Sequence, residues 1–365
     1  MDLNQKLPEV CKLFRIEDQY LGYETIQMGN VNCTYKVNFL LNETGKPKSF
    51  LVQNVNTYAF RNPIALMDNI DMVTEHIRAK NPGKIALHFH HTAERKTYVV
   101  DGENFWRMTN YIPSITYNSV KDLDIVRNAG MAFGEFQEEL SDFDITRLQE
   151  TIPGFHNTRK RYADLEQAVA LDPVGRLAQV QKELDFLMSV RDTACTLTDL
   201  QLAGELPLRV THNDTKINNV LFSPEDSHAM VVIDLDTVMP GLMGHDFGDA
   251  IRFAANRVEE DCQEPQKAGV DLQVFEAFAQ GFLGKTARAM TEKEVETLGL
   301  SCFALTAELS VRFLDDYIRG DPYFNTRRPD HNLERARCQI ALARAMLDKL
   351  PQMDAVIRRC VEQYC

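Results

Sequence analysis

The sequence lacks the features that mark several protein classes. Its eight cysteines are scattered, and no two of them form a C-x-x-C pair. In a chain of 365 residues this pattern indicates buried thiols and argues against a disulfide framework or a cysteine-based zinc site. No run of about 18 apolar residues occurs, so we expect no membrane partner. The chain is polar from its start and shows no apolar signal core, so we expect a cytoplasmic protein.

Positive charge is also scarce. The 40 Lys and Arg residues are outnumbered by 53 Asp and Glu residues, for a formal net charge of −13. This balance argues against nucleic acid or an anionic membrane as the main partner. A phosphate-bearing small molecule stays compatible with it, because a local pocket can be positive or hold a metal ion. Internal repeats and low-complexity linkers are absent from the sequence. We expect two lobes, residues 1–111 and 112–365, in a monomer or dimer.

The stretch 208–222 is the strongest candidate for a reaction centre. Apolar residues at both of its ends enclose a polar loop, which predicts a strand, a loop and a second strand. Asp214 is followed five residues later by Asn219, and the next apolar strand ends at Asp234. A phosphoryl transferase needs a carboxylate that accepts the proton of the attacking hydroxyl, and it needs hard oxygen ligands for Mg²⁺. The same spacing occurs in the kinase catalytic loop and its metal-binding aspartate.

Each of these residues alone could be an ordinary loop residue, since Asn and Asp are common in turns. Together with His212, and with strands on both sides, they favour a catalytic site. We therefore predict Asp214 as the general base, Asn219 and Asp234 as Mg²⁺ ligands, and His212 as a support of the loop.

The first 111 residues predict mainly strands. Helices are expected at 3–14 and 63–80, and strands at about 20–26, 35–40, 49–55, 84–89, 97–100 and 104–111. A turn at Gly29 and Asn30 could place backbone N–H groups over a triphosphate, although most such turns belong to plain hairpins. Strand 49–55 carries Gln53 at its centre, where a protein kinase has a lysine that binds the nucleotide phosphates. The hinge to the second lobe would present backbone to the adenine at Asn110, Tyr111 and Ile112.

Two further groups in this half have open interpretations. Asp71 or Glu75 of helix 63–80 could point at the nucleotide, or both could be solvated. His88 and His90 would share one face of a strand, but no third ligand accompanies them at a suitable spacing, so we do not assign a metal there.

The second half is predicted to be mostly helical. Helices are expected at 120–140, 159–171, 173–190, 270–283, 291–320, 332–350 and 354–364, with a further one that starts near His245. Asp246 or Asp249 could cap that last helix or reach back to orient the catalytic loop. Arg312 and Asp316 could form a surface ion pair or belong to a polar wall that recognises a hydroxylated substrate.

These motifs resemble the aminoglycoside phosphotransferase and choline kinase-like superfamily, and within it the N-acetylhexosamine 1-kinases. The resemblance extends over nearly the whole chain. It is carried by residues 208–219, 233–241, 246–253 and 312–324, and more loosely by 29–35. It implies an α+β, protein-kinase-like fold of two lobes, with an antiparallel sheet in the N-lobe and a mainly helical C-lobe. It also implies that ATP and Mg²⁺ are used to phosphorylate the anomeric hydroxyl of N-acetylglucosamine or N-acetylgalactosamine.

The resemblance also implies site residues. Asp214 would be the base, and Asn219 and Asp234 would hold Mg²⁺. The expected sugar contacts are Asn32, Asp214, Arg312 and Tyr323, and the expected nucleotide contacts are Gly29, Asn30, Gln53, Asn110, Tyr111 and Ile112. Members of this family share a Gln-bearing strand, whereas Asn30 stands where they usually have His. Two alternatives stay open: a kinase for choline, homoserine or an aminoglycoside, and a non-catalytic nucleotide- or sugar-binding protein.

Overall fold

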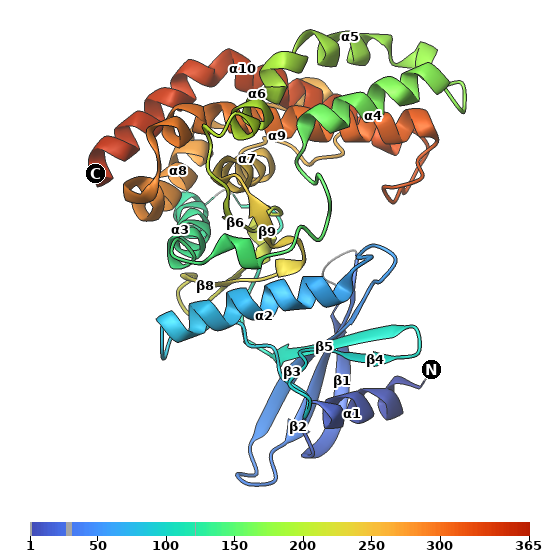
Figure 1. Ribbon diagram of the computed structural model, residues 1–365, viewed down its shortest axis with the longest axis vertical. Helices are drawn as coiled ribbons and strands as arrows, with labels where there is room; N and C mark the ends of the chain where they lie inside the picture. Colours follow the sequence, from blue (N-terminus) through green and yellow to red (C-terminus); the bar gives the residue numbers. More distant parts are fainter. Residues whose placement is uncertain (1, 27–30, 121) are drawn as a thin grey trace.

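The computed structural model describes residues 2–26, 31–120 and 122–365. Gly29 and Asn30 lie outside the described residues, so their role in binding nucleotide stays a prediction. The chain folds into a smaller sheet-containing lobe and a larger helical lobe, with the N-terminus in the first and the C-terminus in the second (Figure 1).

An antiparallel sheet of five strands forms the smaller lobe, in the order β1-β2-β3-β5-β4. The strands are β1 (Gln19–Ile26), β2 (Cys33–Leu40), β3 (Pro47–Val55), β4 (Val99–Asp101) and β5 (Asn104–Asn110). Helix α1 (Leu3–Leu13) packs on the sheet through an apolar cluster that includes Leu7 and Val10 of the helix and Phe50 and Trp106 of the sheet. All of these side chains are buried, so this lobe has an apolar core of its own.

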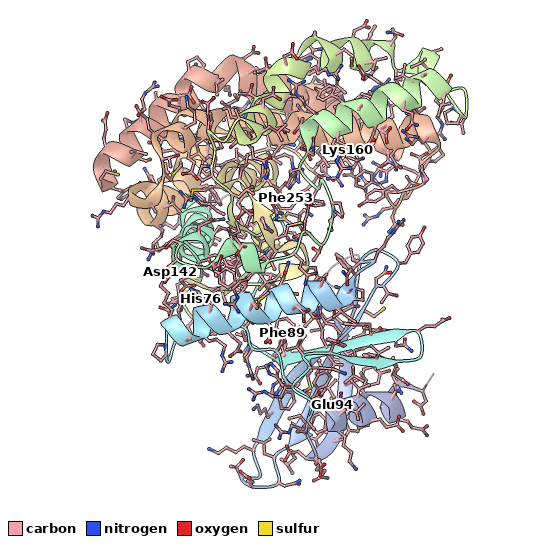
Figure 2. All side chains as sticks on the ribbon, viewed as in Figure 1. His76, Phe89, Glu94, Asp142, Lys160 and Phe253 are labelled. Atoms are coloured by element: carbon pink, nitrogen blue, oxygen red, sulfur yellow. The ribbon has the colours of Figure 1, made fainter. Side chains whose placement is uncertain are left out.

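Helix α2 (Pro63–Lys80) connects the two lobes. Asn62 caps it by accepting from the amide of Ala65, and Pro63 occupies the first turn, where its missing N–H costs nothing. Its buried face belongs to the core of the larger lobe. At its other end, His76 lies 3.0 Å from the carboxylate of Asp142, and Figure 2 shows these two side chains facing each other. The helix therefore lies between the sheet and the larger lobe (Figure 1).

The predicted strand 84–89 is wrong. The segment is irregular and makes an isolated bridge from Phe89 to Thr109 and a hydrogen bond from the His90 amide to Met108. The outer edge of β5 is already occupied by β4 along residues 104–106. Only the end of β5 near Thr109 is left for the segment 84–89 to pair with. Local sequence patterns do not reveal that an edge is occupied.

Eight α-helices are described in the larger lobe. They are α3 (Leu123–Glu139), α4 (Thr158–Leu171), α5 (Gln181–Ser189), α6 (Arg191–Leu202), α7 (Met243–Ala254), α8 (Leu272–Thr286), α9 (Glu292–Arg319) and α10 (His331–Tyr364). Two small antiparallel sheets accompany them, β6 (Arg209–Thr211) with β9 (Met239–Gly241), and β7 (Val220–Phe222) with β8 (Ala229–Val232). Helices α3 and α8 pack with their backbones in close contact. Gly130 and Gly281 permit this approach, since a Cβ atom at either position would collide with the facing helix.

Several predicted helix boundaries need correction. The range 173–190 contains a short 3₁₀ turn, Leu177–Gln179, and α5, because Asp172 and Gly175 adopt positive φ values that interrupt the predicted helix. Helix α6 was not predicted. The ranges 332–350 and 354–364 form one helix, α10, which continues through Pro351 because the buried residues beyond it extend the same packed face. Helix α7 starts at Met243, slightly earlier than expected.

Helix α9 is the one described helix that is long and apolar enough to cross a membrane by composition. Within its most apolar window, 78% is buried inside the protein, which is typical of a core helix. One of its three buried carboxylates, Glu308, contributes to the site described below.

Candidate functional site

The catalytic loop between β6 and β7 is anchored by Asp246 of α7. The carboxylate accepts from the backbone amides of His212 (3.0 Å) and Asn213 (2.7 Å), and from the side-chain amide of Gln137 (2.6 Å). Burial raises the pKa of Asp246, and these three donors oppose that effect. The nearby Asp249 accepts from the Thr215 amide at 3.1 Å. Both acids therefore fix the backbone on either side of Asp214.

His212 holds the same loop from inside. Its Nδ1 accepts from the amide of Asp214 at 3.2 Å, and its Nε2 lies 2.8 Å from the carbonyl oxygen of Ile233. A carbonyl can only accept and an amide can only donate, so the ring is neutral with its proton on Nε2. The ring is fully buried and lies edge-on to the rings of Phe133 and Phe136. His212 thus connects the catalytic loop to the strand that precedes Asp234.

Asp214 is surrounded by donors. Its carboxylate pairs with Lys216 at 2.7 Å and lies 3.3 Å from the side-chain amide of Asn219, which also donates to the Asp214 carbonyl at 2.8 Å. Burial alone would raise the pKa of Asp214, but the ammonium of Lys216 holds it below its usual value. The carboxylate is therefore ionised at neutral pH and is able to accept a proton. Lys216 was not singled out in the sequence, although it lies only two residues after the predicted base.

Asn219 and Asp234 come together because β7 and β8 are paired. Val220 is opposite Val232, and the amide of Ile233 donates to the Asn219 carbonyl at 2.9 Å. Asp234 has a positive φ of 61°, which turns the chain directly after the strand. Its side chain reaches solvent, yet lost hydration and the carboxylates of Asp236 and Asp214 raise its pKa to about 6. The three predicted residues therefore meet at one site that has excess negative charge.

This charge and donor set fit a hard cation. Mg²⁺ binds through one or two carboxylates and completes its shell with phosphate oxygens and water, so a full cage of protein ligands is not required. Among the described residues, no group of three or more His, Cys, Asp and Glu side chains forms such a cage. Asn219 and Asp234 would hold the ion, and the ion would neutralise charge on the phosphates.

A second acid, Asp236, connects this site to the smaller lobe. It is buried and pairs with the guanidinium of Arg107 from β5, and its other oxygen accepts from the side-chain amide of Asn32 at 2.6 Å. Arg107 also donates to Gln53 at 2.9 Å. Asn32 and Gln53 were predicted to contact sugar and nucleotide, respectively, and in the structure each hydrogen-bonds within this network.

The predicted hinge lies where the two lobes join. The Tyr111 amide donates to Ser49 at 3.2 Å, the side chain of Asn110 lies 3.0 Å from His90, and the Ile112 carbonyl accepts from Ser114 at 3.0 Å. Ile115 then pairs with Phe222 of β7 through two backbone hydrogen bonds of 2.9 Å. The linker is thus attached to the strand that follows Asn219, and its contact with a nucleotide stays a prediction.

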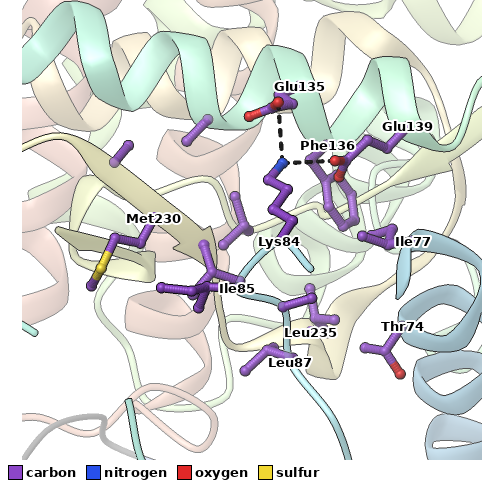
Figure 3. A pocket seen from close by; sticks show the side chains of 15 residues that line it. Thr74, Ile77, Lys84, Ile85, Leu87, Glu135, Phe136, Glu139, Met230 and Leu235 are labelled. Carbon is purple, nitrogen blue, oxygen red and sulfur yellow. Dashed lines mark hydrogen bonds and ion pairs between the residues drawn. The ribbon is translucent and has the colours of Figure 1, made fainter. Parts of the chain in front are cut away.

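Asp71 and Glu75 of α2 both have partners close to the end of the helix or in the segment after it. Asp71 pairs with His91 at 3.2 Å, and Glu75 contacts Arg78 and, at 3.3 Å, His88. Both pairs hold the irregular segment after α2. That segment lines a cavity of about 40 Å³, where Lys84 pairs with Glu135 and Glu139. Figure 3 shows the side chains that line it. Ligand pockets generally measure about 300–1,000 Å³, so this cavity is too small for a nucleotide.

A buried group on the larger lobe lies beside the catalytic loop. Glu308 of α9 accepts from Thr158 at 2.8 Å and pairs with His156 at 3.0 Å. The other ring nitrogen of His156 lies 3.5 Å from the carbonyl oxygen of Asn213, next to Asp214. Burial opposes ionisation of Glu308, but His156 and the nearby Arg312 and Arg161 lower its pKa to about 2. Glu308 is therefore an ionised carboxylate surrounded by cations.

Arg312 and Tyr323 are at the edge of this group. The Arg312 guanidinium lies over the rings of Phe155 and Phe324, at 5.4 and 5.5 Å from their centroids. Tyr323 is 71% exposed, so its ring is available to a ligand. Asp316 is buried and accepts from the amides of Tyr323 and Phe324 at 2.8 and 2.9 Å. It therefore shapes this loop and is not the exposed partner of Arg312 that a surface ion pair would need.

Replacement of Glu308 by Gln is expected to destabilise the protein by about 3 kcal/mol at pH 7, because the ionised form is favoured by neighbouring cations in the folded state. The sign follows from a folded pKa below the unfolded value of 4.5. The stabilisation is complete above that value and is lost as the pH falls towards 2. Urea unfolding of wild type and Glu308→Gln at pH 7 and pH 4 measures this; an equal difference at every pH down to 3 would contradict it.

Comparison with known proteins shows that the sequence and the fold of this chain are similar to those of phosphotransferases. A family model described as "Phosphotransferase enzyme family" matches residues 75–289, more than half of the chain. The structure is similar to an aminoglycoside phosphotransferase from Alicyclobacillus acidocaldarius, with a TM-score of 0.62 at 17% identity over 97% of this chain and 96% of the other. A microcompartment-associated aminopropanol kinase gives 0.63 at 13% identity over 96% and 98%. Spectinomycin phosphotransferase, in complex with ADP and spectinomycin, gives 0.56 at 15% identity over 94% and 98%. These likenesses confirm the predicted kinase-like fold, with a sheet-containing N-lobe and a helical C-lobe.

Proposed function

Because the chain belongs to the phosphotransferase enzyme family, we propose that it transfers the terminal phosphoryl group of ATP to a hydroxyl group of a small acceptor. The observation that carries this proposal is the arrangement of Asp214, Asn219 and Asp234 at the adjoining ends of β7 and β8. The ADP complex of the similar spectinomycin phosphotransferase also supports nucleotide use.

The residues would divide the chemistry as follows. Asp214 orients the acceptor hydroxyl and takes its proton as the new O–P bond forms and the bond to the leaving ADP breaks. Lys216 lies within 2.7 Å of Asp214 and would place positive charge beside the transferred phosphoryl group. Asn219 and Asp234 would hold Mg²⁺, which neutralises charge on the nucleotide phosphates. Asp246 and His212 keep this arrangement fixed before substrate binds, so little reorganisation is needed during the reaction.

For the acceptor we propose an N-acetylhexosamine, phosphorylated at its anomeric hydroxyl. Support comes from the sequence resemblance and from two arginines beside the catalytic loop. Arg161 and Arg312 lie near the ionised Glu308, and Asp164 is a further carboxylate near Arg161. A neutral sugar is tolerated there, and its hydroxyl and carbonyl oxygens can accept from arginine.

Amine acceptors are the alternative, since the similar structures include an aminopropanol kinase. A panel of acceptors separates the two classes. ADP release from MgATP is measured with N-acetylglucosamine, N-acetylgalactosamine, glucosamine, choline, homoserine, aminopropanol and an aminoglycoside. We expect the acetylated sugars to give the highest kcat/KM, and glucosamine, which differs by its charged amine, to be much poorer. Turnover of choline or aminopropanol above that of both acetylated sugars would reject the sugar assignment.

A further inference from the structure

A cation that could replace the lysine absent at Gln53 of β3 is found on the neighbouring strand. In the pairing of β3 with β5, Gln53 stands directly opposite Arg107. The two side chains lie on the same face of the sheet, and Nε of Arg107 donates to Oε1 of Gln53 at 2.9 Å. Gln53 in turn donates to Thr34 of β2 at 3.0 Å. The guanidinium is thus held in place by two strands of the sheet.

The other side of this guanidinium meets the larger lobe. Nη1 of Arg107 pairs with Oδ1 of Asp236, in the short turn Leu235–Thr237 that directly follows Asp234. The two side chains are 3% and 4% exposed. The second oxygen of Asp236 accepts from Asn32 at 2.6 Å, and Asn69 of α2 donates to the carbonyl of Val238 at 3.0 Å. Three separate parts of the smaller lobe therefore bind the turn that bears the proposed metal ligand.

The burial of this pair decides how it can act. A guanidinium that is 3% exposed and already bonded to Gln53 and Asp236 has little surface left for a nucleotide phosphate. A buried ion pair contributes little net stability compared with apolar residues of similar size. Separation of the two partners would leave a buried charge without compensation, so the pair disfavours other placements of the two side chains. The pair therefore fixes the position of the Asp236 turn relative to the N-lobe sheet. Arg107 also neutralises the charge of Asp236, so Asp234 remains as the carboxylate that can bind a metal ion.

We propose that Arg107 and Asp236 form an interlobe ion pair that positions the Asp234 turn against the N-lobe sheet, and that it takes the place of a lysine at the position of Gln53 in β3. The inference rests on the proposed function, since it assigns Arg107 as a positioning residue for metal–nucleotide binding. Asp236 acts here as the partner of Arg107 and is not itself a metal ligand.

Binding of MgADP tests this pairing without any acceptor. The Kd of MgADP and the Mg²⁺ concentration needed for half-maximal ADP binding are measured by calorimetry for wild type, Arg107→Met, Asp236→Asn and the double variant. We expect each single variant to weaken MgADP binding by about tenfold or more, and the double variant to be no worse than either, because all three lose the same ion pair. Arg107→Lys, which keeps the charge, should recover part of the affinity.

The matched control is Lys6→Met, which removes a surface ion pair with Asp101 in the same lobe and should bind MgADP like wild type. Unchanged binding by Arg107→Met would overturn the inference. So would an increased Mg²⁺ requirement in Asp236→Asn alone, since Asp236 would then be a metal ligand. If Arg107→Met does not fold, Asn32→Ala and Arg107→Lys decide: we expect both to weaken binding, and wild-type affinity in both would overturn the inference. A wild-type protein that binds no MgADP would overturn the proposed function as well.

Discussion

Replacement of Asp214 by Asn is expected to lower kcat by about 10²–10⁴-fold, because the acceptor hydroxyl loses the group that takes its proton. The amide has nearly the shape of the carboxylate and keeps one oxygen, which can accept from Lys216, while Asn219 still donates to the backbone carbonyl of residue 214, so the loop should stay folded. MgADP binding should change by less than about threefold, since the proposed metal ligands Asn219 and Asp234 are unaltered. Steady-state ADP release and calorimetric MgADP binding measure the two effects separately.

The matched control is Asp226→Asn. Asp226 is an exposed aspartate in the β7–β8 connection and pairs only with His228 in the described ion pairs. The Asp226→Asn variant should have the kcat of the wild-type protein. A near-normal kcat for Asp214→Asn would show that Asp214 is not the base, and the proton would then have to leave by another route.

Replacement of Asp246 by Ala is expected to have the largest effect on stability. The carboxylate is 1% exposed and accepts from two backbone amides and one side-chain amide. Its loss leaves these donors buried without a partner, which should lower the unfolding free energy by about 3–5 kcal/mol. Displacement of the loop should also lower kcat by about 10²-fold, because catalysis depends on the position of Asp214 to within about 1 Å. Urea unfolding and ADP release measure the two effects.

Asp192→Ala provides the control for this variant. Asp192 is likewise an acid in the first turn of a helix, α6, but it is exposed to solvent. We expect its replacement to change stability by no more than about 0.5 kcal/mol. If Asp246→Ala were equally mild, the loop would be held by other contacts, and its rigidity could not be attributed to α7.

The site was predictable where its residues are close in sequence. Asp214 and Asn219 share one loop, and Asp234 ends the next strand, so spacing alone indicated that they meet. A contact of Asp246 or Asp249 with the loop was one of two alternatives, beside capping of the helix. In contrast, the contact of Arg107 with Gln53 depends on the register between β3 and β5, and its contact with Asp236 depends on how the lobes close. Neither appears in any local pattern.

Other parts of the fold also required tertiary information. Strand 84–89 was predicted from composition, but whether a segment pairs depends on a free sheet edge. Glu308 was hidden because an acid in a long apolar helix is normally exposed, and the partners that keep it ionised, His156 and Arg312, are separated from one another by most of the larger lobe's sequence. The helix that carries Glu308 was predicted at 291–320 and is observed as α9.

Identification of the phosphorylated product tests the central claim most directly. Wild-type protein is incubated with MgATP and N-acetylglucosamine, and the mixture is followed by phosphorus NMR, with a parallel sample that contains a chelator of Mg²⁺. We expect ADP and a sugar phosphate whose phosphorus couples to the anomeric proton, and neither product in the chelated sample. Unchanged ATP with every acceptor of the panel, at a protein concentration that binds MgADP, would contradict phosphoryl transfer at this site.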